Sequence, residues 1–389
     1  MEHMANMGRH LIRSYKYRLY PNGAQEAALS DMLGHFCDLY NAGLQQRIEA
    51  WNRQGVSLGY VDQANELKAV RDAVPELAGY SYSAEQQVLR RLDKAFAAFF
   101  RRVKAGETPG FPRFRAKSRF HSADFRVGDG LVCKGGKLRL VGIPGLVKVR
   151  WHRELPAKPV HAIVSRSNGK WFVTLQFKVR DLRVPGEEDT RPDVGIDVGL
   201  NSIVATSDGV TVPAPRHLRK AQARTRRLQR ALARNERNSK RRAKARRNLA
   251  RHHGRVAAAR RDFLHKLSHD LASRHRVIAM EDLNMEALKR SFLARSVHDA
   301  AWRRLRDMLT YKAESAGGSV VLVDPRGTTQ RCSGCGRDPD RPKTLGERVH
   351  GCDGCGLVLN RDVNAARNVL QLVQGPGTGL RSRSVRVAA

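Results

Sequence analysis

Long apolar runs and the usual signatures of nucleotide-binding and hydrolase folds are absent from this sequence. No stretch reaches the roughly 18 consecutive apolar residues that a membrane-spanning helix needs. The first residues, MEHMANMGRH, lack the apolar core of a signal peptide. No Walker phosphate loop, G-x-G-x-x-G motif or nucleophile-elbow serine occurs, which argues against P-loop, dinucleotide-binding and serine-hydrolase classes. We therefore expect a protein of the cytosol, or of the nucleoid in a bacterium, with no membrane partner.

Acidic residues are scarce relative to basic ones. The chain has 37 Asp and Glu against 72 Lys and Arg, a formal charge of +35. Charge of this size repels itself unless a polyanion lies beside it, and nucleic acid is the natural candidate. An anionic membrane surface would call for a lipid-facing amphipathic helix or a lipidation motif, and the sequence has neither. Between Arg216 and Arg261 nineteen Lys and Arg accompany a single acid, Glu236, which favours nucleic-acid contact over an ordinary solvated face of mixed sign.

Cysteine is also rare, and its placement is informative. Four of the six cysteines form two C-x-x-C pairs: Cys332, Cys335, Cys352 and Cys355. In a reducing compartment this spacing indicates a metal site rather than disulfides. Four thiolates leave no open coordination position, so we expect one structural Zn²⁺, which would contribute on the order of 10 kcal/mol to folding this ribbon. Cys37 and Cys133 are predicted to be small buried apolar residues.

The first half of the chain combines strands with helices. Residues 14–20 alternate apolar and basic side chains, as a strand does. Apolar residues then recur at helical spacing over 24–51, and a second helix is predicted from Ser83, with Gln86 completing a capping box. The region 124–180 is strand-rich and has a type I′ hairpin signal at Asn168-Gly169. These elements predict a small antiparallel barrel interrupted by a helical insertion, whose two helices pack together.

The segment PGFPRFRAKSRF alternates aromatic and basic residues. Phe111, Phe114 and Phe120 could stack on unpaired bases while neighbouring arginines meet phosphates. Phenylalanines that anchor a loop to the core would give the same pattern. Both interpretations remain open at this stage.

The second half has an α/β pattern after a polar linker at 181–192. Strands are predicted at 194–198, 202–207, 276–281 and 319–323, with a very long helical span between the second and third. One narrow apolar stripe on that span, including Leu249, Val256 and Phe263, is available for docking. His265 and His269 have helical metal-ligand spacing, but without an H-E-x-x-H glutamate we interpret them as residues of the basic face.

Three acids occupy unusual positions in this half. Asp197 and Glu281 each end an apolar strand, and Asp362 falls on a predicted helix after the cysteines. A carboxylate at the end of a buried strand is costly unless a cation meets it. Such a trio is what an RNase H-type nuclease uses to hold two divalent metals, which activate water and stabilise the leaving oxygen. Oxygen ligands imply Mg²⁺ or Mn²⁺.

Other acids lie near strand ends or helix starts and are weaker candidates. For these we expect helix caps or surface ion pairs: Asp193, Asp282, Asp299 and Asp324.

The sequence resembles the TnpB family, the RNA-guided nucleases of insertion sequences, related to type V CRISPR effectors. The resemblance extends from about Tyr15 to Val369 and rests on ordered blocks: YKYRLYP, PGFPRFR, GIDVGLNSIVATSDG, RRDFLHKLSHDLASRHRVIAMEDLN, SVHDAAW, LTYKAESAGGSVVLVDP, TTQRCSGCG and RDVNAARN. It implies that Asp197, Glu281 and Asp362 are the catalytic, ion-binding acids. One departure is Asn360, which stands where the family often has an additional acid, so we take Asp362 as the ligand.

The resemblance also implies an α+β multidomain architecture. Its parts would be 1–22, first strand of a wedge-like β-barrel; 23–125, helical recognition insertion; 126–190, remainder of the barrel; 191–326, RuvC-like (RNase H-like) α/β nuclease domain; 327–357, zinc-ribbon insertion; 358–373, last nuclease helix; and 374–389, a disordered tail.

The implied partners are a guide RNA from the element's own end and complementary double-stranded DNA beside a short flanking motif, with a monomer favoured. Two other functions stay open at this stage. One is a nuclease-inactive, RNA-guided DNA-binding repressor, and the other is a transposase acting directly on element ends.

Overall fold

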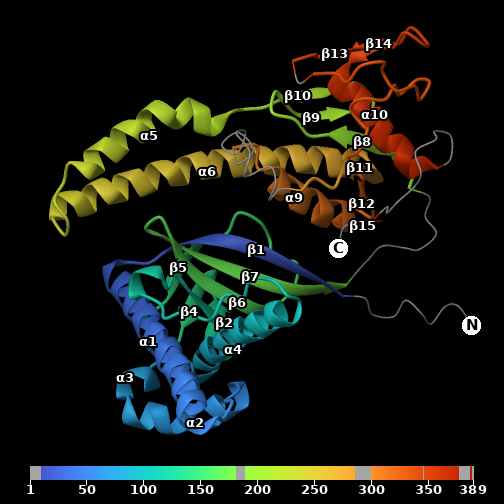
Figure 1. The fold of residues 1–389 in the computed structure, drawn as a ribbon. Helices are drawn as coiled ribbons and strands as arrows, with labels where there is room; N and C mark the ends of the chain where they lie inside the picture. Colours follow the sequence, from blue (N-terminus) through green and yellow to red (C-terminus); the bar gives the residue numbers. More distant parts are fainter. Residues whose placement is uncertain (1–9, 181–188, 285–298, 345, 376–385, 388–389) are drawn as a thin grey trace, which may run out of the picture. The chain divides into compact units, whose positions relative to one another are not determined.

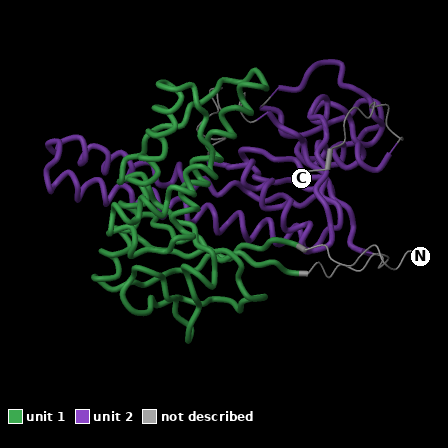
Figure 2. The backbone as a smooth tube through the Cα atoms, turned by 90° about the horizontal axis from the view of Figure 1, so that it is seen from below, with its two compact units in different colours: residues 1–182 green, residues 183–389 purple. Residues whose placement is uncertain are grey.

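The computed structural model describes residues 10–180, 189–284, 299–344, 346–375 and 386–387. The chain forms two compact units, residues 1–182 and 183–389, which Figure 2 shows in different colours. In the described ranges, no helix combines the length and the apolar character that a bilayer crossing requires.

Unit 1 is built on a seven-stranded antiparallel sheet in the order β2-β6-β7-β1-β5-β4-β3 (Figure 1). Its strands are β1 (His10–Tyr20), β2 (Ser122–Arg126), β3 (Leu131–Lys134), β4 (Lys137–Leu140), β5 (Val147–Arg150), β6 (Pro159–Ser167) and β7 (Lys170–Arg180). A bridge between Val127 and Leu131 links the segments at the two edges, so the sheet is a nearly closed barrel. Asn168 and Gly169 both have positive φ, 51° and 69°, which confirms the predicted I′ turn.

The barrel differs from the expectation at two points. β1 begins at His10, earlier than the predicted start at 14, and β2 begins at Ser122, inside the interval expected to be helical. Both differences have the same cause, because β1 and β2 are completed by long-range pairing with β7 and β6 that the local pattern does not contain.

Helices cover the barrel of unit 1: α1 (Gly23–Gln54), α2 (Tyr60–Ala73), α3 (Pro75–Ala78), α4 (Tyr82–Lys104) and the short 3₁₀ turn η2 (Lys117–Arg119). The expected packing of α1 against α4 is confirmed, and both helices share one apolar core with the strands. The predicted cap of α4 was wrong by two residues. Ser81, not Ser83, is the N-cap and accepts a bond from the Ala84 N–H at 3.3 Å.

Unit 2 contains a six-stranded sheet in the order β10-β9-β8-β11-β12-β15, in which β8, β11 and β12 are parallel. Its strands are β8 (Val194–Asp197), β9 (Ser202–Thr206), β10 (Thr211–Pro213), β11 (Val277–Glu281), β12 (Ser319–Val323) and β15 (Arg386–Val387). Four of them confirm the predicted strands to within one residue. One face of the sheet packs on α6 (Lys240–Arg274) and α9 (Trp302–Ser315), and the other on α10 (Arg361–Gln374).

The predicted long helical span is two helices, α5 (His217–Ala233) and α6, which lie antiparallel (Figure 1). The chain reverses at 234–239, where Asn238 has a φ of 65°. Thr225 on α5 and the buried His252 on α6 hydrogen-bond at 3.1 Å. The span breaks because Ser239 caps α6 and the Arg242 side chain donates to the carbonyls of Leu232, in the last turn of α5, and of Asn235, just beyond it.

The cysteine region follows β12 and includes the two-stranded sheet of β13 (Val349–Gly351) and β14 (Val358–Asn360). Most of the expected disordered tail, 374–389, lies outside the described residues. Gln374 is the last residue of α10, and Arg386 and Val387 pair with β12, so the expectation was wrong for these three residues.

Candidate functional site

Two of the predicted acids end adjacent parallel strands. Met280 of β11 pairs with Ile196 of β8, and the next residue on each strand is Glu281 or Asp197. Both acids are buried, each with 7% of its surface exposed. Since parallel strands end at the same edge of a sheet, their carboxylates face the same region.

Asp362 reaches this edge from the first turn of α10. The N-cap of that helix is Asn360, whose Oδ1 accepts bonds from the backbone N–H groups of Asp362 (2.8 Å) and Val363 (3.3 Å). An asparagine oxygen does this as well as a carboxylate, so the departure from the family's acidic pattern at Asn360 leaves the helix start intact.

Gly195 allows α10 to lie against β8. A Cβ on this residue would come within 2.0 Å of the Ala366 carbonyl oxygen, which is backbone and cannot rotate away. Just beyond the strand, a Cβ on Gly199 would lie 2.8 Å from the Ser202 carbonyl oxygen and at an ordinary 3.9 Å from Asp362 Oδ2. Gly195 therefore permits the close approach of α10 to β8 that brings Asp362 to the two strand-end acids.

The two strand-end carboxyls have raised pKa values. Burial raises the pKa of Asp197 well above its usual value, and the charges of Glu281 and Asp362 raise it further, against the Val198 N–H and Arg361. Burial also raises the pKa of Glu281, partly offset by a hydrogen bond from Thr328. Asp362 also has one long ion pair, with the Arg348 guanidinium at 3.9 Å. Three carboxylates close together, two of them buried, suit a divalent cation with oxygen ligands.

A polar network behind the acids was not predicted. The Thr328 hydroxyl donates to Glu281 Oε1, and its backbone carbonyl accepts from Asn368 Nδ2 at 2.8 Å. Asn368 also bonds the Arg331 carbonyl (2.8 Å), and Asn364 accepts from the Ser333 N–H (2.8 Å). Both asparagines are fully buried on α10. The signal for them was in NRDVNAARN, where two amides four residues apart share the buried side of a helix.

The competing acids have the ordinary roles expected for them. Asp193 pairs with Arg276 and Asp282 with Arg306, each at 3.0 Å. Asp324 accepts from the Arg326 N–H.

Asp299 has two partners, because it bonds the Leu218 N–H at the start of α5 and the Arg260 guanidinium of α6. It therefore anchors the base of the α5–α6 hairpin.

The four paired cysteines converge on one point. The Cys332 and Cys355 sulfurs are 3.6 Å apart, the Cys335 and Cys352 sulfurs are 3.5 Å apart, and all four lie within 4.8 Å of one another. Within the described ranges this is the one His, Cys, Asp or Glu group this tight. Four thiols at this separation can hold a structural metal in tetrahedral geometry.

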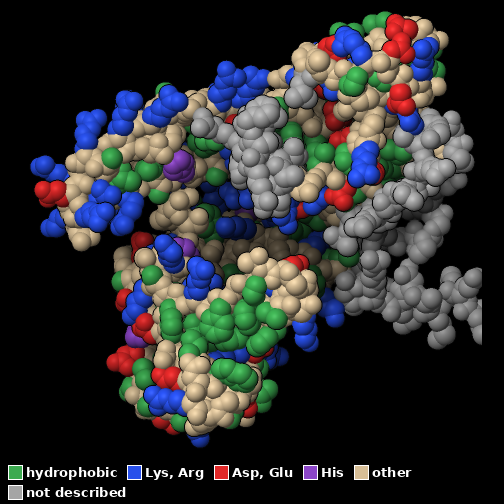
Figure 3. Space-filling view, viewed as in Figure 1, with side chains coloured by type: hydrophobic (Ala, Val, Ile, Leu, Met, Phe, Trp, Pro, Cys, Tyr) green, Lys and Arg blue, Asp and Glu red, His purple; other side chains and the backbone are tan. Residues whose placement is uncertain are grey.

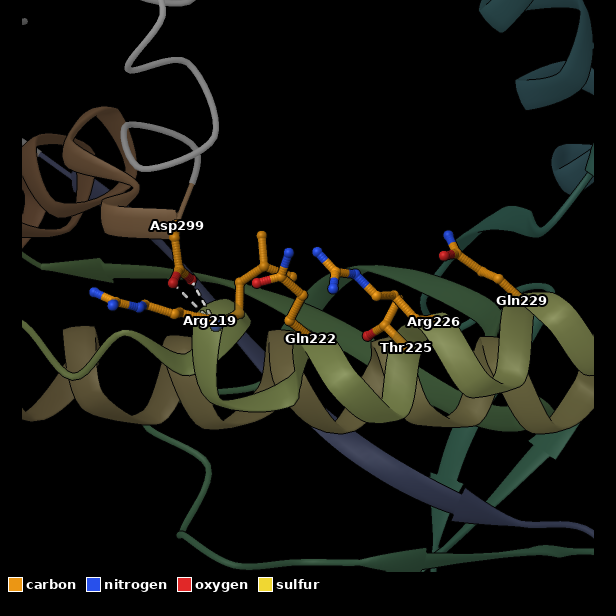
Figure 4. Close-up of a pocket in the computed structure, with 7 residues that line it drawn as sticks. Arg219, Gln222, Thr225, Arg226, Gln229 and Asp299 are labelled. Atoms are coloured by element: carbon orange, nitrogen blue, oxygen red, sulfur yellow. Dashed lines mark hydrogen bonds between the residues drawn. The ribbon is translucent and has the colours of Figure 1, made fainter.

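The basic span forms a cationic surface on unit 2. Lys and Arg side chains lie along α5 and α6 (Figure 3), and none of the α5 residues is buried. Figure 4 shows Arg219, Gln222, Arg226 and Gln229 in a row on one side of α5. They line a groove of about 540 Å³, with Asp299 at its end. The row alternates guanidinium and amide groups at one-turn intervals, a pattern able to contact a polyanion.

Comparison with known proteins identifies the family. Over 365 residues the chain is 36% identical to a putative RNA-guided DNA endonuclease of Streptomyces pristinaespiralis, covering 92% of this chain and 88% of that protein. The chain belongs to the TnpB family. A second relative, the putative RNA-guided DNA endonuclease InsQ of Escherichia coli K12, is 28% identical, with 92% of each chain covered.

Family models match three segments, described as a helix-turn-helix domain (7–55), a probable transposase (176–291) and a Cas12f1-like TNB domain (302–369). In this TnpB-family chain the first description does not fit the fold, because the described part of that segment, from residue 10 onward, consists of β1 and a single unbroken helix, α1. A solved Cas12f1–sgRNA–target DNA complex has a similar fold, with a TM-score of 0.59 at 12% identity, covering 93% of this chain and 99% of that one.

Proposed function

We propose that this chain is a transposon-encoded, RNA-guided DNA endonuclease. It would bind a structured guide RNA and cut complementary double-stranded DNA beside a short flanking motif. The observation that carries the proposal is the convergence of Asp197, Glu281 and Asp362 from three distant segments at one edge of the sheet. The names of the relatives and the cationic α5–α6 surface support the same function.

We assign metal ligation in the nuclease site to the three acids. Asp197, Glu281 and Asp362 would hold two Mg²⁺ or Mn²⁺ ions, which when bound supply an activated water and stabilise the leaving oxygen. The chain's own contribution is positional. Burial of the two strand-end acids keeps bulk water from their carboxylates, and Thr328 fixes the orientation of Glu281. We assign Zn²⁺ to the four cysteines as a structural ion, because four sulfur ligands close its coordination shell.

The domain assignment follows from this function. The barrel of unit 1 would be the wedge, α1–α4 the recognition insertion, and the sheet of unit 2 the RuvC-like nuclease domain, with the cysteine ribbon inserted before its last helix.

The test is cleavage by the protein purified with its RNA. Asp197→Ala or Glu281→Ala should abolish cutting of guide-matched DNA in Mg²⁺ while the RNA stays bound. Asp282→Ala is the matched control, because this acid neighbours Glu281 but pairs with Arg306 at the surface. Cutting that survives in Asp197→Ala would refute the site assignment. Target binding without any nicking by the wild type would favour the repressor, and guide-independent joining of element ends would favour the transposase.

A further inference from the structure

A second feature of unit 1 is a pocket lined by aromatic and arginine side chains. It lies between α1, α4 and the loop before η2, and has a volume of about 480 Å³. Its lining includes four arginines and no acid: Arg102, Arg113, Arg115 and Arg119. Among the described residues, none of these guanidiniums forms an ion pair with a carboxylate.

The three phenylalanines of this loop divide into different roles. Phe120 is buried at 4% exposure and belongs to the core of unit 1. Phe111 packs edge-on against Phe96 and Phe99, at centroid distances of 5.6 and 5.4 Å. Phe114 is 55% exposed, and within the described chain its ring contacts no other aromatic ring. The two interpretations of this segment therefore apply to different residues. Phe120 anchors the segment to the core, whereas the ring of Phe114 is exposed and available for stacking.

The backbone that carries Phe114 is held firmly. Asn41 on α1 bonds both polar groups of the next residue, accepting from the Arg115 N–H (2.8 Å) and donating to its carbonyl (2.9 Å). The Cys37 thiol donates to the same carbonyl at 3.2 Å, and Pro112 is buried just before. An exposed ring on a backbone fixed in this way loses little freedom when a ligand stacks on it.

We propose that this pocket binds an unpaired nucleotide, whose base stacks on Phe114 while its phosphates meet Arg113 and Arg119. An exposed aromatic face surrounded by unpaired cations is the combination by which proteins hold single strands without sequence preference. The bases inside a duplex stack on one another, so their faces are not available to the ring. This inference rests on the proposed function, because it assigns a binding site for single-stranded RNA or DNA within a nucleic-acid-binding chain.

The test uses Phe114→Trp, which keeps an aromatic face and adds a fluorescent reporter. Short oligothymidylate and oligouridylate should each be titrated into this variant of the full chain and into the wild type, whose four tryptophans give the background. The added fluorescence should be quenched by single strands and not by a duplex of the same length. The oligonucleotide that quenches at lower concentration distinguishes DNA from RNA. Equal quenching by duplex, or none by either single strand, would overturn the proposal.

A second measurement separates stacking from the general attraction of a basic protein. Phe114→Leu keeps the apolar bulk but removes the ring, and should weaken single-strand binding about tenfold at high salt, where stacking remains and charge attraction fades. Phe100→Leu is the matched control, since Phe100 is 52% exposed on α4 and does not line the pocket. Equal affinity of the two leucine variants would refute the site. Both titrations are done with the wild-type active site and without added Mg²⁺ or Mn²⁺, so they measure binding to the pocket whether or not the nuclease proposal holds.

Discussion

At the scale of single residues, the acidic site consists of carboxylates whose burial disfavours their charged form, and neighbouring polar groups keep them in position. Asp197 and Glu281 are buried with raised pKa values, and the Thr328 hydroxyl donates a hydrogen bond to the Glu281 carboxylate. The acids and cysteines were predictable from the sequence, because strand-end carboxylates and C-x-x-C pairs are local signals. Thr328, Asn364 and Asn368 were not, because their value lies in contacts across more than thirty residues of chain.

Replacing Thr328 tests the positioning of Glu281. Thr328→Val removes the hydroxyl at nearly constant volume and should lower the cleavage rate about tenfold, equivalent to one lost hydrogen bond to a charged group of about 1.4 kcal/mol. Because the effect acts through an ion ligand, the Mg²⁺ concentration for half-maximal cutting should also rise. Thr328→Ser should restore both values. Equal Mg²⁺ dependence in the valine variant and the wild type would show that the hydroxyl does not position Glu281.

Glu85 gives unit 1 a pH-dependent stability. It is fully buried, and burial raises its pKa from 4.5 to about 7 although Arg71 bonds it at 2.6 Å. The folded state therefore binds a proton more tightly than the unfolded state. The resulting stabilisation is complete below pH 4.5 and is lost as the pH rises through about 7.

The free energy of unfolding, measured in urea across this range, should fall with pH in the wild type. Glu85→Gln should lack that part of the slope, whereas Glu76→Gln, at an exposed position, should keep it. Parallel slopes for all three proteins would show that Glu85 does not titrate in this window.

At the scale of elements, the apolar period closely predicted four of the six strands of unit 2 and the two main helices of unit 1, although the cap of α4 lies two residues before the predicted one. The predicted bounds were wrong for elements that depend on distant partners. β1 and β2 extend further than their own patterns indicate. The basic helical span, predicted as one span, folds back at 234–239. α2 and α3 were not predicted, because their apolar positions are few. Only Gln63, Leu67 and Leu77 are buried on them.

Gly195 should be intolerant of any side chain. Gly195→Ala places a methyl group 2.0 Å from the Ala366 carbonyl oxygen, so α10 must move away from β8 and carry Asp362 with it. Overpacking of this kind costs about 1–3 kcal/mol, and cutting should fall by more than the loss of folded protein explains. Gly23→Ala is the control, because its added methyl meets nothing within 4 Å. Full activity of Gly195→Ala would show that α10 does not need this close contact.

At the scale of the whole chain, the cysteine cluster and the acidic site are linked through α10. Asn364 bonds the Ser333 N–H beside Cys332, and Asn368 bonds the Thr328 carbonyl. Loss of the metal should therefore loosen the segment that carries Thr328 as well as the ribbon itself.

Metal removal tests this link. Treatment with a zinc-selective chelator, or Cys335→Ser, should speed hydrogen exchange over 328–333 and reduce cutting even in excess Mg²⁺. Added Zn²⁺ should reverse the effect of the chelator but not that of the substitution. Unchanged exchange at 328–333 after complete removal of the metal would show that the ribbon and the acidic site are independent.

The most direct measurement is the position of Mn²⁺ in crystals of the RNA-bound protein, located by anomalous diffraction. We expect two Mn²⁺ ions among the carboxylates of Asp197, Glu281 and Asp362, and their loss in Asp197→Asn. Absence of Mn²⁺ from this cluster in a protein that still cuts DNA would show that the three acids are not the nuclease site.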